Sequence, residues 1–271
     1  PDDFIEKIRA AVKRVSPEKF LLGEVWEDAT TKFGFNKRRT YLLGKGLDSV
    51  MNYPFKNAVL DFVKGKPAEQ AMTEILTICE HYPAPAMDTA LNFLSTHNTE
   101  RALTVIADEP ANGRGRAWQS GRCVTGDAYE EGLLRLRMAY AIIYTLPGVP
   151  CLYYGDEIAM QGYRDPFNRA FFRWDAHEQR LRPVLAQLAQ LRHTCEAFRT
   201  GQLRVLRAEG GILHYQRVGK VETAEIIVNR TEHIIVETLA SGKSTEVNPM
   251  GFTIVVEEVG HNPDHSYYDY V

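Results

Sequence analysis

The stretch NFLSTHNTERALT, residues 92–104, joins an apolar run to a dense group of polar side chains. The apolar start is typical of a buried strand, and the polar residues follow where that strand would end. In domains built from parallel strands, the side chains after the carboxyl ends of the strands carry the chemistry. The middle of this group is Asn98, a neutral amide at a place where such a site usually holds a carboxylate.

Apolar strands and amphipathic helices alternate on both sides of this stretch. The pattern predicts strands over 19–28, 46–55, 90–98 and 149–158, and helices over 1–15, 56–65, 67–82, 129–148 and 179–198. This alternation favours a parallel sheet with crossover helices, and the nearly continuous apolar runs favour strands that are covered on both faces. We therefore expect an α/β domain over residues 1–199.

From about residue 200 the pattern changes to short β-rich segments separated by Gly, Asn and charged turns. This change predicts a separate antiparallel β-sandwich over residues 200–260. The tail over residues 261–271 is polar and aromatic, and we assign no element to it. The first predicted helix has no strand before it, which suggests a domain that has been cut from something larger.

Composition and charge exclude several classes of function. The chain has 32 Lys and Arg against 35 Asp and Glu, and this balance does not favour a nucleic acid or an anionic membrane as partner. No apolar run approaches the roughly 18 residues that a membrane span needs, and no signal peptide opens the chain. Four widely spaced cysteines without a C-x-x-C motif indicate free thiols in a reducing compartment, so we expect a cytoplasmic protein.

The predicted strand ends bring residues suited to chemistry to one rim of the sheet. These residues are Glu24 with Trp26, Asn52 with Tyr53, His97 with Asn98 and Arg101, and Asp156 with Glu157. Carboxylates, an imidazole and aromatic rings on one rim form a surface suited to a polyol.

Four segments in this order resemble the α-amylase superfamily, the family 13 glycoside hydrolases. They are GEVW (23–26), SVMNYPF (49–55), FLSTHNTER (93–101) and GVPCLYYGDEIAMQGYRDPFNRAFFRWD (148–175). The second segment is similar to the neopullulanase and cyclomaltodextrinase branch. The resemblance covers residues 1 to about 200. It implies the second half of a (β/α)8 TIM barrel, strands 5–8 with their helices, followed by a small antiparallel all-β C-terminal domain.

The resemblance also implies an activity, the retaining hydrolysis of α-glucosidic bonds in starch, maltooligosaccharides or cyclomaltodextrins. This reaction uses two carboxyl groups about 5–5.5 Å apart, one as nucleophile and one as proton donor. Glu24 matches the general acid/base, which must keep its proton near neutral pH in a partly desolvated site. His97 matches a histidine that binds sugar hydroxyls. Asp165 and Arg169 match residues of the donor-side sugar sites, although a loop salt bridge would explain this pair equally well.

Other residues on the rim have two possible roles. Trp26, Tyr53 and Trp174 could offer their faces to glucose rings, or they could belong to the core. Asp156 and Glu157 are expected to be structural. We expect no cofactor and no metal, because the usual calcium ligands of relatives come largely from a part of the family that this chain does not match.

The sequence departs from the family pattern in two ways. Asn98 stands where the family has an aspartate that stabilises the cationic transition state, and loss of such a charge typically costs about a hundred- to a thousandfold in rate. In addition, no residue in 1–271 matches the motif of the nucleophilic aspartate. We therefore expect a C-terminal portion of an α-glucan hydrolase that is inactive alone. The open edges of a half barrel predict either a homo-oligomer or dependence on the missing N-terminal half.

Two alternatives remain open at this level. The chain could be a non-catalytic α-glucan-binding or assembly module, which keeps the cleft without the chemistry. A metal-dependent hydrolase would need clustered ligands, and the histidines show metal-like spacing only in the tail pair His261 and His265.

Overall fold

The computed structural model describes residues 1–107 and 109–259 and the backbone of 266–270, so His261 and His265 lie outside the described residues. The helices are α1 (Asp2–Val15), α2 (Tyr53–Lys64), α3 (Ala68–His81), α4 (Ala84–Asp88), α5 (Ala102–Ala107), α6 (Arg116–Ser120), α7 (Gly126–Thr145), α8 (Leu181–Thr194) and α9 (Glu196–Thr200), with the 3₁₀ turns η1 (Asp156–Ile158) and η2 (Phe167–Arg169). The strands are β1 (Leu22–Gly23), β2 (Phe33–Gly34), β3 (Lys37–Arg38), β4 (Ser49–Val50), β5 (Leu91–Asn92), β6 (Val149–Pro150), β7 (Gln202–Glu209), β8 (Ile212–Val218), β9 (Glu222–Asn229), β10 (Ile235–Thr238), β11 (Ser244–Val247), β12 (Gly251–Glu258) and β13 (Ser266–Tyr270).

Very short parallel strands lie side by side in chain order. β1 pairs with β4, and β5 pairs with β6, both in parallel. A parallel bridge between Met51 and Leu91 joins the two pairs, so that the order is β1, β4, β5, β6. These are the four predicted strands in the predicted order, although each of them forms only two residues of ladder.

Helices cover the parallel strands and supply most of the apolar core. α2 packs on α3, α5 and α7, and α7 packs on α8. Phe55, Phe62 and Ile142 are fully buried between them, and each such side chain contributes about 1.5–3 kcal/mol. The ends of α2 follow from the sequence, because the Asn52 side chain accepts a hydrogen bond from the Phe55 amide and Gly65 ends the helix at φ 135°.

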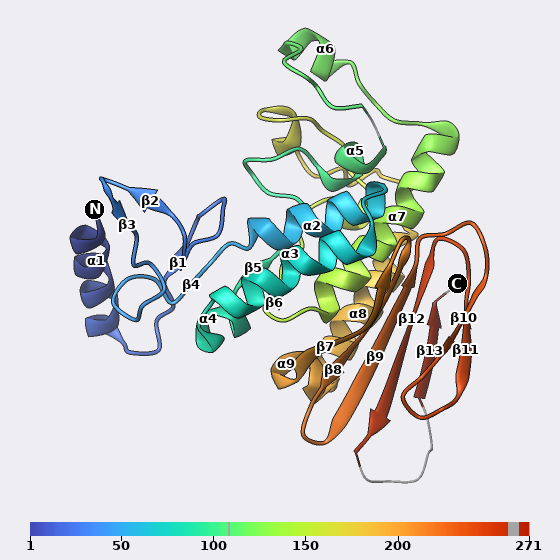
Figure 1. Ribbon diagram of the computed structural model, residues 1–271. Helices are drawn as coiled ribbons and strands as arrows, with labels where there is room; N and C mark the ends of the chain where they lie inside the picture. Colours follow the sequence, from blue (N-terminus) through green and yellow to red (C-terminus); the bar gives the residue numbers. More distant parts are fainter. Residues whose placement is uncertain (108, 260–265, 271) are drawn as a thin grey trace.

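The N-terminal segment lies at one side of the molecule (Figure 1). α1 is held to the strand layer by Asp48, which forms ion pairs with Arg9 at 2.7 Å and Lys13 at 2.9 Å. The β2–β3 hairpin is joined to the start of α1 by an ion pair between Arg39 and Asp2 at 2.7 Å. These ion pairs hold α1 and the hairpin against the strand layer, in which Glu24 directly follows β1.

The C-terminal region is an antiparallel sheet in the order β13-β12-β9-β8-β7 (Figure 1). Its residues alternate between two faces, as strands require. Tyr215, Ile226 and Ile254 join the main core, to which α7 and α9 contribute. Ile227 and Val255 face a second cluster with Leu239 and Val247 of the β10–β11 region.

Several predicted boundaries were wrong. The predicted helix over 179–198 breaks at Cys195, whose backbone is extended at ψ 117°, and continues as α9. The tail over 261–271, to which we assigned no element, contains β13, which pairs with β12. The pattern also missed α4, α5, α6 and the β2–β3 hairpin, because these elements are too short to show a period. Among the described helices, none is long and apolar enough to cross a bilayer.

Candidate active site

Glu24 is the meeting point of three segments that are far apart in the sequence. It directly follows β1, Tyr53 begins α2 after β4, and Asn98 lies in the loop between β5 and α5. The Glu24 Oε1 accepts hydrogen bonds from the Tyr53 hydroxyl and from the Asn98 Nδ2, both at 2.7 Å. The ends of neighbouring parallel strands thus bring these predicted residues together.

His97 completes this group from the exposed side. Its Nε2 lies 3.8 Å from the Glu24 Oε2 and 3.0 Å from the Asn98 Nδ2. The His97 side chain is 50% exposed and that of Glu24 is 33% exposed, so both remain accessible to a ligand. One amide nitrogen therefore bridges the carboxylate and the imidazole.

The electrostatics of Glu24 differ from those expected for a resting proton donor. Burial is the largest influence and acts to raise the pKa of Glu24, but hydrogen bonds from Tyr53 and Asn98 act in the other direction. The imidazole of His97 and a hydrogen bond with Trp26 lower it further, and the net pKa lies below the ordinary 4.5. Without a bound ligand, Glu24 is thus ionised at neutral pH, whereas the sequence led us to expect a protonated acid.

Arg169 reaches the same group from the loop after β6. Its Nε donates to the His97 carbonyl at 2.9 Å, and its Nη2 lies 3.4 Å from the Asn98 Oδ1. Arg169 also forms an ion pair with Asp165 at 3.2 Å. The salt bridge considered from the sequence exists, and the same arginine contacts the site.

The predicted aromatic residues fall into different environments. Trp26 stacks on Tyr53 with ring centroids 4.7 Å apart and 10° between the planes, and it is 47% exposed. Tyr53 is buried and packs its edge against Phe93 at 4.9 Å. Trp174 is 90% exposed, which excludes a core role. An exposed indole supported on a buried ring is suited to contact with a sugar.

Asp156 is buried and paired, as expected for a structural residue. It forms a buried ion pair with Arg101 at 3.1 Å and accepts a hydrogen bond from the Tyr140 hydroxyl at 2.5 Å. Arg101 was predicted on the rim, but it is fully buried, with its guanidinium 4.5 Å from the ring centre of Tyr153 and 4.7 Å from that of Tyr154.

Asn52 is a second rim prediction that was wrong, because its side chain is fully buried. Its Nδ2 donates to the Asn92 Oδ1 at 2.9 Å, and its Oδ1 caps α2. The Asn52 side chain cannot both cap the buried start of α2 and lie exposed on the rim.

The sequence predicted no role for Asn168, although this residue is important to the geometry of the site. Asn168 lies between Asp165 and Arg169, is fully buried, and donates from its Nδ2 to carbonyl groups of the loop that carries His97. The only sequence signal would have been a small polar residue inside an aromatic-rich loop.

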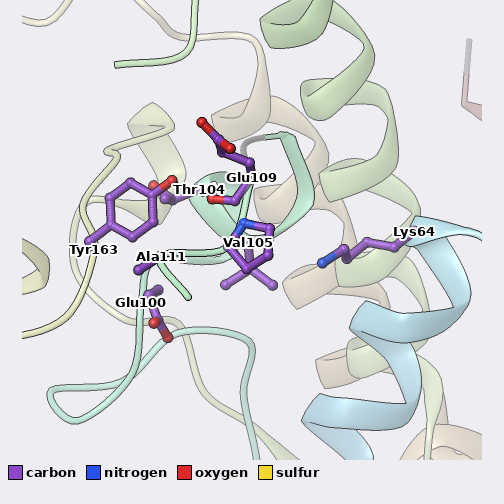
Figure 2. A pocket seen from close by; sticks show the side chains of 8 residues that line it. Lys64, Glu100, Thr104, Val105, Glu109, Ala111 and Tyr163 are labelled. Atoms are coloured by element: carbon purple, nitrogen blue, oxygen red, sulfur yellow. Dashed lines mark hydrogen bonds between the residues drawn. The ribbon is translucent and has the colours of Figure 1, made fainter. Parts of the chain in front are cut away.

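A separate pocket of about 130 Å³ lies between α2, α5 and the following loop (Figure 2). Its lining consists of Lys64, Glu100, Thr104, Val105, Glu109, Pro110, Ala111 and Tyr163. Figure 2 shows the Lys64 side chain entering from α2, on the side opposite Tyr163. None of the predicted site residues lines this pocket, and the candidate site is the partly exposed group around Glu24. Across residues 1–107 and 109–259, no three His, Cys, Asp or Glu side chains form a metal-binding group.

Comparison with known proteins defines the class to which this fold and site belong. The family of the alpha-amylase catalytic domain matches residues 1–190. The chain therefore belongs to the alpha-amylase family.

Relatives within the family carry several names. The chain is 31% identical over 231 residues to an amylopullulanase of Thermoanaerobacter thermohydrosulfuricus, which covers 79% of this chain and 14% of the relative. It is 31% identical over 234 residues to a cyclomaltodextrinase of Geobacillus thermopakistaniensis, with 84% and 34% covered. It is 29% identical over 251 residues to neopullulanase 2 of Thermoactinomyces vulgaris, with 89% and 37% covered.

Solved structures show the same fold. A cyclic alpha-maltosyl-(1→6)-maltose hydrolase from Arthrobacter globiformis superposes with a TM-score of 0.79 at 24% identity, over 96% of this chain and 53% of that one. The type III pullulan hydrolase from Thermococcus kodakarensis gives a TM-score of 0.77 at 25% identity, over 94% and 42%. The chain therefore spans about half, or less, of the length of these proteins.

Proposed function

We propose that the chain carries the acid/base side of a retaining α-glucan hydrolase site, of the kind that acts on starch, maltooligosaccharides or cyclomaltodextrins. In this proposal residues 1–199 form strands 5–8 of a TIM barrel with their helices, and residues 200–260 form the β domain. The observation that carries the proposal is the convergence on Glu24, whose Oε1 accepts from Tyr53 and Asn98 at 2.7 Å each. The family membership and the names of the relatives support the substrate class.

In this proposal Glu24 is the group that would protonate the glycosidic oxygen where a nucleophile faces it across the bond. A glucan that settles over the site excludes water from Glu24 and competes for the amide and hydroxyl donors, and both effects raise the pKa of Glu24 toward that of a proton donor. His97 binds sugar hydroxyls near the bond to be broken, and Asp165 and Arg169, joined by their ion pair at 3.2 Å, line the donor-side sugar sites. Trp26 offers its exposed ring to a glucose unit.

The same geometry supports the proposal that this chain binds α-glucan without cleaving it. Retaining hydrolysis needs a second carboxylate about 5–5.5 Å from the acid. Besides burial, the groups of the described residues that act most strongly on the pKa of Glu24 are a hydroxyl, an amide, an imidazole and an indole, and none of them is a carboxylate. Asn98 touches Glu24 directly at 2.7 Å, which is hydrogen-bond contact and not the spacing of a nucleophile.

Two measurements on the purified chain test this function. Isothermal calorimetry with maltooligosaccharides should detect binding, and reducing-sugar assays on maltooligosaccharides, cyclomaltodextrin and pullulan should detect no turnover. Robust turnover would overturn the proposed inactivity, and a lack of binding would overturn the proposed substrate class.

Matched variants locate the binding surface. His97→Ala and Arg169→Ala each remove a contact within the site, so each should weaken maltooligosaccharide binding. Arg173→Ala is the control, because Arg173 lies in the same loop but pairs with the exposed Asp175. Equal affinities in all three variants would place the glucan elsewhere.

A further inference from the structure

Asn168 occupies an unusual position between two loops. It lies in η2, is fully buried, and belongs to the same turn as Arg169. Its Nδ2 is 2.8 Å from the Thr99 carbonyl, 2.9 Å from the His97 carbonyl and 3.2 Å from the Thr96 carbonyl. One amide group with two hydrogens thus satisfies carbonyl groups along a whole turn of another segment.

Those carbonyl groups belong to the loop between β5 and α5, which carries His97 and Asn98. Within the loop itself the support is short-range, such as the hydrogen bond from the Asn98 amide to the Thr96 Oγ1 at 3.1 Å. The His97 carbonyl receives a second donor from η2, the Nε of Arg169. The backbone of His97 is therefore held by two side chains of another loop, whereas its imidazole is half exposed.

The two loops are also joined by backbone contacts farther along. The Arg101 amide donates to the Gly162 carbonyl at 2.9 Å, and the Gly162 amide donates to the Thr104 Oγ1 at 2.9 Å. A Cβ at position 162 would lie 2.4 Å from the Phe167 carbonyl, so only glycine fits there. The loops are packed closely enough that the geometry of one determines that of the other.

We propose that Asn168 is a positioning residue, which fixes the loop of residues 96–99 so that His97 and Asn98 face Glu24 and the sugar. Its consequence for sugar binding rests on the function proposed above. Asn168 acts through the backbone, because its Nδ2 donates to main-chain carbonyl groups of that loop.

The chemistry of the position explains why asparagine is suited to it. The position needs a buried, uncharged donor on a short side chain, such as the Nδ2 of asparagine three bonds from Cα, because three carbonyl oxygens converge there. Leucine has a similar size but would leave these carbonyl groups without the donor, and aspartate would face them with lone pairs. The Asn168 Oδ1 has no hydrogen-bond partner within the described part of the chain, so the nitrogen makes the contribution.

The chain contains a matched control for the loss of this amide. Asn229, in β9, is also fully buried, and its Nδ2 donates to the carbonyl groups of His233 at 2.8 Å, Asn248 at 3.0 Å and Val247 at 3.1 Å. Replacing either asparagine with leucine removes the same kind of donor from the same number of carbonyl groups. Only Asn168 holds a loop of the candidate site.

The experiment compares Asn168→Leu with Asn229→Leu in the full chain by two readouts. Hydrogen exchange should become at least about tenfold faster at the Asn98 and Arg101 amides in Asn168→Leu, because the loop opens locally. Calorimetry with maltoheptaose should show affinity at least about tenfold weaker in the same variant. Asn229→Leu should leave both the exchange of this loop and the affinity as in the wild type.

The outcomes separate this inference from the proposed function. Unchanged exchange in the loop of Asn168→Leu would overturn the inference, and so would wild-type affinity in a wild type that binds maltoheptaose. If the wild type binds no maltoheptaose, the proposed function fails and the exchange measurement still decides the role of Asn168. If circular dichroism shows Asn168→Leu unfolded, Asn168→Ser takes its place, since a hydroxyl keeps one donor and should give an intermediate exchange rate.

Discussion

Asn98 bridges Glu24 and His97 through a single amide nitrogen, at 2.7 and 3.0 Å. Aspartate at this position would remove the donor and add a negative charge beside Glu24. Both changes disfavour the ionised acid, so Asn98→Asp should raise the pKa of Glu24. Carbon-detected NMR titration of the Glu24 carboxyl measures this directly. Asn98→Ala, which removes only the donor, should raise the pKa less, and an unchanged or lower value in Asn98→Asp would contradict the assignment.

The same residue links stability to pH. Because the pKa of folded Glu24 lies below the ordinary 4.5, its ionised form stabilises the fold above that value, and this stability is lost as the pH falls through the folded pKa. Asn98→Asp should therefore reduce the free energy of unfolding at neutral pH, and the difference from the wild type should shrink in acid. Urea unfolding at neutral and acid pH measures both values.

At the scale of elements, the sequence predicted the order of the strands better than their lengths. The predicted strands were nine or ten residues long, but only two residues of each form a ladder. Val25, Phe93 and Leu94 follow the ladders and are nevertheless buried. Burial alone produces an apolar run, so the pattern cannot distinguish a paired strand from a buried loop.

Helix ends and motif residues were predictable for a different reason. Gly65 ends α2 through local chemistry that a sequence shows directly, whereas the start of α2 was predicted at residue 56 because Asn52, its N-cap, was assigned to a strand. Tyr53, His97 and Asn98, which were predicted on one rim with Glu24, lie beside it in the structure. The role of Asn168 and the ionisation of Glu24 depend on segments distant in the chain, and no local pattern contains that information.

The buried pair of Arg101 and Asp156 joins η1 to the start of α5. Arg101 is fully buried and Asp156 is 2% exposed, so removing one charge leaves the other uncompensated. Asp156→Asn should lower the free energy of unfolding by about 3–5 kcal/mol. Chemical denaturation measures the change. The control is Asp175→Asn, which breaks an exposed pair with Arg173 and should change little; equal effects of the two variants would contradict the prediction.

At the scale of the whole molecule, the outer strands leave apolar residues at the surface. Leu22 in β1 is 36% exposed, Val149 in β6 is 43% exposed, and Phe20 before β1 is 51% exposed. Strand edges of this kind recruit other strands. We expect self-association at micromolar concentration, measured by size-exclusion chromatography with light scattering. A single monomeric species would contradict this expectation.

A charge on the strand edge gives a sharper version of the same test. Leu22→Lys places an ammonium group on the edge of β1 and should reduce self-association. Leu43→Lys is the control, because Leu43 is 68% exposed but lies outside the parallel strands. Equal loss of association in both variants would show that general surface polarity, and not the strand edge, determines assembly.

In the described residues, β1 is paired only on the side of β4, and Glu24 is the residue that follows it. A strand that paired in parallel with the opposite edge of β1 would lie about 4.8 Å from it. The residue after the last paired position of that strand would then lie beside Glu24. The identity of that residue would decide whether Glu24 gains a catalytic partner or the surface only binds sugar. If a separate strand that ends in aspartate is supplied in trans, the outcome thus depends on the register in which it pairs with β1.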